Sequence, residues 1–409
     1  MGIDKKGGGN EKKALEGVFA PVEEALEALR RGDFIIVVDD EDRENEGDFV
    51  VAAERVTPEH INTMARVGGG LVCLALNPKR FDELQLALPV PNTSKMGTPF
   101  GVPIDAKDVT TGTSAYERAM TARWAADPSK GPEDFVRPGH LYTLRAAEGG
   151  VLRRAGHTEA SVDLARLAGL YPAAVICEIM DEDGRMARLP KLAEVAKRLG
   201  VKIISVNQII EYRLKRELTV RRLLQRPLPT RWGQFTLHAY EDTITGEVHF
   251  ALVSGEVKDG ILVRVQKGCV VGDVFGALTC DCREQLDSAL WRIANEGGVL
   301  VYLSQTPKGE AFLKRTLGHI DPEELWEDDP RYIGTGAQIL RDLGVKRFRL
   351  LTNNPRKIKG LEGFGLEIVE RVPLLPRPRP ENAEYLKKKR DVLGHMLGPI
   401  EEGVENEGV

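Results

Sequence analysis

The sequence has few cysteines, few aromatic residues and no long apolar run. Among its 409 residues are five cysteines, and aromatic residues make up 6%. No apolar run approaches the roughly 20 residues that a membrane-spanning helix needs. An odd number of cysteines without a secretory signal indicates a reducing cytosol rather than a disulfide framework. We therefore expect a cytoplasmic protein with no membrane partner.

An excess of basic residues is also missing. Lys and Arg total 57 against 62 for Asp and Glu, a formal net charge of -5. A protein that coats nucleic acid is usually basic, so we expect no nucleic-acid partner. Local basic pockets for phosphate groups are still compatible with this balance. The length is typical of two or three domains, each large enough to bury its own core.

The two ends of the sequence are poor in apolar residues. The first residues are rich in Gly and Lys and lack the apolar centre of a signal peptide. We expect a disordered tail over residues 1–15 and a frayed acidic tail over residues 401–409.

Hydrophobic spacing predicts alternating helices and strands in the first half. The expected helices cover residues 21–31, 192–199 and 208–214, and the expected strands cover residues 34–38 and 201–206. This alternation predicts an α/β (α+β layered) domain. Residues 215–231 then become rich in Arg, Leu and Pro. We place the domain boundary near residues 211–218, which gives domains over residues 16–213 and 214–400.

The second half shows the same two kinds of pattern. Strands are expected at residues 235–240, 248–253, 299–303 and 347–351, with helices at residues 284–295 and 336–343. The sequence therefore predicts a second α+β domain.

An acidic run follows the first predicted strand. Residues 39–48 contain seven carboxylates in ten positions. A charge run alone is more often a solvated loop. Here, however, the run lies at a strand end, where α/β domains place their sites. It also contains Arg43 and Gly47, which suit a phosphosugar site and a close backbone approach.

Two of the seven histidines lie beside glycines and arginines. His140 taken alone is more often structural. His157 belongs to a Gly-His-Thr-Glu bend that offers an imidazole, a hydroxyl and a carboxylate to a divalent cation. Arg43 and Arg154 supply planar donors for phosphate, although each alone reads as a surface residue.

Two further residues lie in or at the end of apolar strands. Glu178 follows the apolar run at residues 173–177 and is a candidate acid or base. Cys73 lies inside a second apolar run. It could form a pocket wall, but we favour core packing.

The segments at residues 39–48, 109–115, 137–140 and 153–159 resemble the signature segments of 3,4-dihydroxy-2-butanone 4-phosphate synthases, over roughly residues 22–213. The resemblance implies an α/β homodimer that converts ribulose 5-phosphate to 3,4-dihydroxy-2-butanone 4-phosphate and formate. It implies Mg²⁺ or Mn²⁺ held by Glu44 and His157, and it makes His140 and Glu178 necessary for turnover. The implied substrate-site residues are Arg43, Glu44, Asp48, Arg154, Ala155, Gly156, His157, Thr158 and Glu178.

That chemistry suits these residue types. Enolisation of a ketose phosphate needs a base and a metal ion that polarises the carbonyl. The later rearrangement and loss of formate need further proton transfers. Carboxylates and a histidine around one cation can supply them.

Three of the five cysteines lie within 14 residues of one another. Cys269, Cys280 and Cys282 form a C-x10-C-x-C pattern. Three thiolates and one water make an open, catalytic type of zinc site. The alternative is packing or chance, but Cys-x-Cys at the start of a helix favours a metal.

Segments around these cysteines resemble GTP cyclohydrolase II, which opens the imidazole ring of GTP. They are residues 228–230, 263–265, 272–276, 280–282 and 350–355. The resemblance implies Zn²⁺ held by the three cysteines, Asp329 as proton acceptor and Arg331 as nucleophile. The implied GTP contacts are Arg264, Gln285, Thr352 and Lys357. The order of the two halves resembles the fused bifunctional riboflavin proteins.

The chain departs from the second family at two places. Gln266-Lys267-Gly268 stands where the family carries His-Ser-Glu, and residues 305–312 lack the family's Gln-Glu-Gly-Arg sequence. Three hypotheses follow: an enzyme with both activities, a synthase with a degraded regulatory or dimerising domain, and a zinc-stabilised nucleotide-binding protein without catalysis. We expect the fold of the second half to persist and GTP turnover to be weak or absent.

Overall fold

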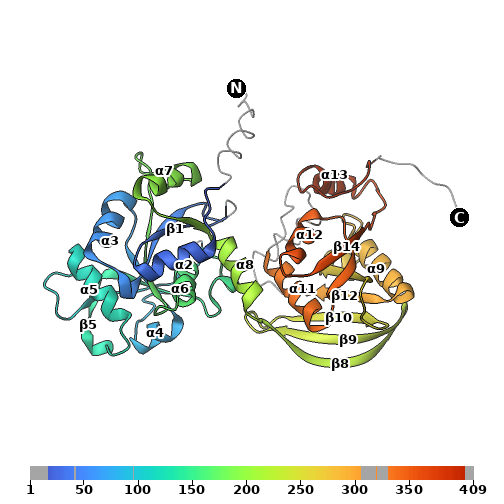
Figure 1. The fold of residues 1–409 in the computed structure, drawn as a ribbon, viewed down its shortest axis with the longest axis horizontal. Helices are drawn as coiled ribbons and strands as arrows, with labels where there is room; N and C mark the ends of the chain where they lie inside the picture. Colours follow the sequence, from blue (N-terminus) through green and yellow to red (C-terminus); the bar gives the residue numbers. More distant parts are fainter. Residues whose placement is uncertain (1–16, 41–42, 95, 305–318, 320–329, 401–409) are drawn as a thin grey trace, which may run out of the picture. The chain divides into compact units, whose positions relative to one another are not determined.

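A computed structural model describes residues 17–40, 43–94, 96–304, 319 and 330–400 (Figure 1). The tails predicted at residues 1–15 and 401–409 lie outside the described residues, as do residues 305–312. The chain divides into two compact units, Met1–Tyr212 and Arg213–Val409. Both are layered α/β structures, as the sequence predicted.

The first unit is built on a seven-stranded mixed sheet of order β4-β5-β3-β6-β2-β1-β7. Its strands are β1 (Ile35–Val38), β2 (Gly47–Ala52), β3 (Cys73–Leu76), β4 (Phe100–Ala106), β5 (Phe135–Arg145), β6 (Ala173–Glu178) and β7 (Ile203–Ser205). Its α-helices are α2 (Val22–Arg31), α3 (Pro58–Thr63), α4 (Pro78–Glu83), α5 (Ala115–Ala125), α6 (His157–Leu167), α7 (Leu189–Leu199) and α8 (Val206–Arg216). The last of these contains the division between the units.

The elements predicted in the first half are present, with several boundaries shifted by one to three residues. Helix α2 buries Val22 and Leu26 and ends at Gly32, whose φ of 91° closes the helix. The predicted strand at residues 201–206 is shorter, because Ser205 caps the next helix, which begins at Val206. The Ser205 hydroxyl accepts from Gln208 N at 3.2 Å, and the Gln208 side chain accepts from Ser205 N at 2.9 Å. This reciprocal pair is a capping box.

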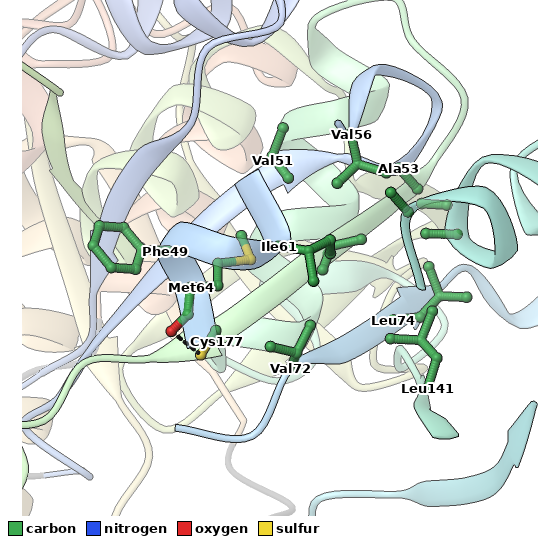
Figure 2. Close-up of a cluster of buried hydrophobic side chains, with 14 of the residues drawn as sticks. Phe49, Val51, Ala53, Val56, Ile61, Met64, Val72, Leu74, Leu141 and Cys177 are labelled. Atoms are coloured by element: carbon green, nitrogen blue, oxygen red, sulfur yellow. Dashed lines mark hydrogen bonds between the residues drawn. The ribbon is translucent and has the colours of Figure 1, made fainter. Parts of the chain in front are cut away.

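One face of the first sheet carries a large hydrophobic core (Figure 2). Phe49 and Val51 of β2, Leu74 of β3 and Ile61 of α3 are 0% exposed. Cys177 joins this core, and its thiol lies 3.5 Å from the Met64 carbonyl oxygen. Cys73, at 2% exposure, is also buried, which agrees with the core-packing interpretation. The core fixes the strand ends that carry the candidate site.

The second unit has its own seven-stranded sheet, of order β14-β13-β11-β12-β10-β9-β8. Its strands are β8 (Val220–Thr230), β9 (Gly233–Asp242), β10 (Val248–Ser254), β11 (Ile261–Lys267), β12 (Gly298–Leu303), β13 (Arg347–Leu351) and β14 (Glu367–Val372). Its α-helices include α9 (Cys282–Glu296), α11 (Pro330–Asp342), α12 (Pro355–Glu362) and α13 (Ala383–Asp391). Figure 1 shows β8, β9 and β10 side by side.

All six elements predicted in the second half are present, and β8, β11, β14, α12 and α13 are additions. The strand β8 contains Pro227 and Pro229, and it lies at the sheet edge, where Pro is tolerated. Strands β11, β12 and β13 are parallel neighbours, so their carboxyl ends meet at one edge. Among the described residues, no helix is long and apolar enough to cross a membrane.

Candidate active site and cysteine cluster

Three strand ends meet at one edge of the first sheet. Strand β1 ends at Val38, directly before Asp39, and β2, which is antiparallel to it, starts at Gly47. Asp48 of β2 pairs with Glu178 at the end of β6. The predicted acidic run and the predicted acid or base therefore share this edge.

Three residues at this edge could hold a metal ion. Asp39, Glu44 and His157 offer ligand atoms that all lie within 4.8 Å of one another. His157 Nδ1 is 3.5 Å from a Glu44 carboxylate oxygen, and its Nε2 is 4.0 Å from one of Asp39. His157 is the first residue of α6 rather than part of the bend that the sequence suggested. A helix position fixes its ring more firmly.

Asp39 organises the loop that carries Glu44. Its side chain is fully buried and accepts from Arg43 Nη1 at 2.7 Å. It also accepts from the backbone N–H groups of Glu44 at 3.1 Å and Glu46 at 2.9 Å. The sequence analysis did not assign Asp39 a role, although it is the first carboxylate after the strand, and that was the available signal.

The charges at this edge shift the pKa values of its members. Burial lowers the pKa of His157, but the charge of Asp48 and the contact with Glu44 outweigh it and raise that pKa to about 9. Burial raises the pKa of Asp48 to about 7. Burial also raises the pKa of Glu44, but the hydrogen bond with His157 and the charge of Arg43 outweigh it, so that the net pKa is lowered.

Two buried polar atoms at this edge have no hydrogen-bond partner among the described residues. They are His157 Nε2 and Asp48 Oδ1. Buried polar atoms are nearly always paired, so an unpaired imidazole nitrogen beside carboxylates needs an explanation. A divalent cation with oxygen and imidazole ligands provides one. The donor set therefore fits the predicted Mg²⁺ or Mn²⁺.

Two arginines converge on Gly156 at the start of α6. A Cβ placed there would lie 2.5 Å from Arg154 Nη1 and 3.0 Å from Arg43 Nη2. Arg154 is held by Glu159 at 2.7 Å and by Thr98 Oγ1 at 3.0 Å. Ala155 and Thr158 flank this point, in the loop and in the first helical turn. Helix N-termini attract anions, so two arginines here suit a phosphate.

Glu178 is oriented by the backbone of the segment before β3. One of its carboxylate oxygens accepts from Leu71 N at 2.8 Å. A Cβ at Gly70 would lie 2.5 Å from the same oxygen, so a larger residue there would displace the carboxylate. The glycine thus allows this close approach.

His140 lies on strand β5, not in the loop that the sequence suggested. The ring Nδ1 of His140 is 2.7 Å from one Asp105 carboxylate oxygen. The backbone N–H of His140 donates to the other oxygen at 2.9 Å. Asp105 is buried in β4 and was not assigned from the sequence, because its pairing with β5 is a tertiary feature. The β3–β5 and β3–β6 registers place His140 toward the same sheet edge as Glu178.

The three clustered cysteines converge in the second unit. Cys269 follows β11, and Cys282 is the first residue of α9, as the sequence predicted. A Cβ at Gly272 would lie 2.9 Å from Cys280 Sγ and 3.4 Å from Cys269 Sγ. The three thiols form a group with His319 that could hold a metal ion. Thiolate donors suit the predicted zinc. The sequence analysis did not assign His319, which is 37 residues beyond Cys282.

The predicted GTP contacts gather near the carboxyl ends of β11 and β13. Arg264 is buried and donates to Gln266 Oε1 at 2.7 Å, to Gln285 Oε1 at 2.6 Å and to the Leu351 carbonyl at 2.9 Å. Thr352 lies just after β13, where its hydroxyl accepts from Asn354 N at 3.0 Å.

The other predicted residues of this site lie in different parts of the second unit or outside the described residues. Lys357 of α12 lines a small hollow together with Lys267 and Tyr332. Arg331 lies in the first turn of α11. Asp329, the predicted proton acceptor, lies outside the described residues.

One of the departures from the GTP cyclohydrolase II family, at Gly268, affects the space around Tyr302. At Gly268, where the family carries Glu, a Cβ would lie 2.8 Å from the Tyr302 hydroxyl. That hydroxyl donates to Asp273 at 2.9 Å. Tyr302 therefore occupies space that a residue 268 side chain would need.

Comparison with known proteins agrees with both halves. The sequence profile of the family 3,4-dihydroxy-2-butanone 4-phosphate synthase matches residues 23–212, and that of GTP cyclohydrolase II matches residues 221–373. The riboflavin biosynthesis protein RibBA of Aquifex aeolicus (strain VF5) is 54% identical over 398 residues, 93% of this chain and 98% of that protein. The chain belongs to the RibBA family. The RibBA protein of Bacillus subtilis (strain 168) is 48% identical over 93% of this chain and 100% of its own length.

A solved structure resembles this chain over most of its length. It is RibBX, described as a two domain 3,4-dihydroxy-2-butanone 4-phosphate synthase from A. baumannii. The TM-score is 0.73 at 41% identity, over 86% of this chain and 99% of that chain. The predicted family, fold class, place in riboflavin biosynthesis and pairing of a lyase domain with a hydrolase-type domain are thus confirmed. The two predicted cofactor types are also confirmed, and each unit contains a group of side chains with the donor atoms that its metal ion prefers.

Proposed function

We propose that the first unit converts ribulose 5-phosphate to 3,4-dihydroxy-2-butanone 4-phosphate and formate at the edge formed by β1, β2 and β6. The convergence of Asp39, Glu44 and His157, with an unpaired buried imidazole nitrogen, supports this most directly. Glu44 and His157 would hold Mg²⁺ or Mn²⁺. The bound cation would polarise the ketose carbonyl and stabilise an enediolate.

The protein groups around that point have separate roles. Arg43 and Arg154, at the N-terminus of α6, would bind the substrate phosphate and fix its position. Asp48, Glu178 and His140 would carry the proton transfers, since enolisation and loss of formate each need a base and an acid. The pKa of Asp48, raised by burial to about 7, lies near neutral pH, which suits a proton carrier.

We propose that this unit works as a homodimer in the cytoplasm. Leu71, Phe100, Val136 and Tyr142 on and beside β3, β4 and β5 are 40–47% exposed. Exposed apolar groups of this kind on neighbouring elements mark interaction surfaces. All five cysteines are free and buried, which suits a reducing compartment. Light scattering on the purified chain would test the dimer.

We propose that the second unit binds one zinc ion per chain through Cys269, Cys280 and Cys282. The three thiols are buried and converge on Gly272. Elemental analysis tests this directly. The Cys280→Ser/Cys282→Ser protein should lose its zinc, and an unchanged zinc content would refute the site.

The synthase activity is tested by measuring formate from ribulose 5-phosphate. We expect formate with Mg²⁺, none after EDTA, and recovery when excess Mg²⁺ is added. Formate release that EDTA does not affect would exclude the metal role. No formate under any of these conditions would refute the proposed activity.

A further inference from the structure

A histidine completes the cysteine cluster of the second unit. Cys269, Cys280 and Cys282 each offer a thiol and His319 offers an imidazole nitrogen, and these four atoms all lie within 4.8 Å of one another. The three cysteines are at most 7% exposed, and His319 is half-buried. Four donors in such a small volume equal the full coordination number of structural zinc.

The spacing between two of these donors matches tetrahedral zinc. With bonds of about 2.3 Å to sulfur and about 2.0 Å to nitrogen, a tetrahedral ion separates the two donors by about 3.5 Å. The distance from Cys282 Sγ to His319 Nδ1 is 3.5 Å. This pair of donors therefore already has the separation that a shared tetrahedral ion requires.

Two contacts place His319 against the cluster. The Thr279 hydroxyl donates to the His319 carbonyl at 2.8 Å, and Thr279 directly precedes Cys280. The Tyr385 hydroxyl lies 3.1 Å from His319 Nδ1, and Tyr385 is 1% exposed. His319 is thus connected both to the cysteine loop and to helix α13.

We propose that His319 is the fourth protein ligand of the zinc ion, so that the site is a closed Cys3His centre. This rests on the zinc site proposed above. A catalytic zinc keeps one coordination position for water or substrate, whereas a structural zinc is closed by four protein ligands. The geometry therefore gives this zinc a structural role. The ion would connect the loop after β11 with the start of α9, and helix α13 contacts the site through Tyr385.

Cobalt substitution in the whole chain tests the proposal without an activity assay. We expect the Co²⁺ protein to show the absorption of a tetrahedral ion with three thiolates and one nitrogen, and azide should leave the spectrum unchanged because no position is open. His319→Ala should alter the ligand-field bands and make them sensitive to azide. Zinc release to a chelator should become at least about 10-fold faster, since even the loss of a group behind a ligand costs about 10–100-fold in affinity.

Two further variants keep the test decisive if His319→Ala folds poorly. His319→Cys should retain zinc, strengthen thiolate-to-cobalt charge transfer and remain insensitive to azide. Tyr385→Phe is the matched control, because it removes the other polar contact of His319 Nδ1 and should keep the wild-type cobalt spectrum.

The results separate two failures. An azide-sensitive wild-type spectrum, or a His319→Ala protein with unchanged spectrum and zinc release, would overturn the ligand role of His319 alone. A wild-type chain without zinc would overturn the three-cysteine site as well.

Discussion

At the scale of single residues, the candidate active site depends on partners distant in the sequence. His157 meets Asp39 and Glu44 over more than 110 positions, and His140 meets Asp105 over 35. In each pair a histidine faces a carboxylate: Asp39 is held by further hydrogen bonds, Glu44 is paired with Arg43, and Asp105 also accepts from the His140 backbone N–H. Changes to either member of a pair should therefore affect chemistry more than stability.

The metal ligands give the first prediction. Glu44→Ala and His157→Ala should each reduce formate release from ribulose 5-phosphate to background, because either change leaves the cation under-coordinated. Steady-state formate assays measure this. Excess Mg²⁺ should restore EDTA-treated wild type but neither variant, and full activity in one variant would remove that residue from the metal site.

Asp105 gives a second prediction. Asp105→Asn should lower kcat by about 10–100-fold with little change in KM, because an amide cannot hold the His140 ring in the same tautomer and orientation. The pH dependence of kcat should change with it. Asp82→Asn, which alters an exposed carboxylate paired with Arg145, is the control. Equal kcat values for Asp105→Asn and wild type would show that Asp105 has no positioning role.

At the scale of elements, each unit places its chemistry where strands end and helices begin. His157 opens α6 and Cys282 opens α9, and both helices cover their sheets. The N-terminus of a helix favours negative charge, which suits carboxylates in one unit and thiolates in the other. The body of each sheet supplies rigidity instead, and it also contains titratable groups.

Strand β10 carries one of these groups, His249, which is 1% exposed. Burial lowers its pKa below the value of 6.5 for an exposed histidine. The unfolded chain then binds a proton that the folded chain does not. Stability is therefore complete above pH 6.5 and decreases as the pH falls through that value, by at most about 1.4 kcal/mol per pH unit for one proton.

His249→Phe should flatten this dependence. We expect the free energy of unfolding of the second unit to fall less between pH 7.5 and 5.5 in the variant than in wild type, as measured by denaturant titrations of the full chain. The difference in unfolding free energy between the variant and wild type at pH 8 reports packing alone and serves as the reference. Parallel pH profiles would exclude His249 as the source.

At the scale of the whole molecule, each unit matches a family of its own, and the two units differ in how completely they keep that family's residues. In the first unit, Glu44, Asp48, His157 and Glu178 lie at one sheet edge, and the strand register places His140 toward that edge. In the second, the Arg264 guanidinium is bound to Gln266, Gln285 and a backbone carbonyl. Gly268 replaces a family carboxylate.

We therefore predict weak or absent GTP turnover by the full chain. Each polar group of a bound nucleotide that lacks a hydrogen-bond partner costs about 1–3 kcal/mol. The loss of two such partners therefore weakens nucleotide binding by about 30-fold or more. Formate should appear from ribulose 5-phosphate and not from GTP. Robust formate from GTP that Arg331→Ala abolishes would contradict this and restore the reading with two activities.

The sequence by itself determined the two families, the class of fold and most of the secondary structure. Hydrophobic spacing located α2, β1, α9 and β13, because local periodicity reports which face of an element is buried. Motifs located Glu44, His157 and the three cysteines, because these side chains lie in short runs of unusual composition.

Only the tertiary structure decided which residues support those groups. Asp105 and His319 have no local signature, since a single carboxylate or histidine is common on any surface, and Asp39 differs from its acidic neighbours only in directly following β1. Each is brought to its proposed site by strand register or by contact with a residue far away in the chain. The same holds for the space at Gly268, which depends on Tyr302 of the neighbouring strand. Sequence patterns describe one element at a time, and a site is made where several elements meet.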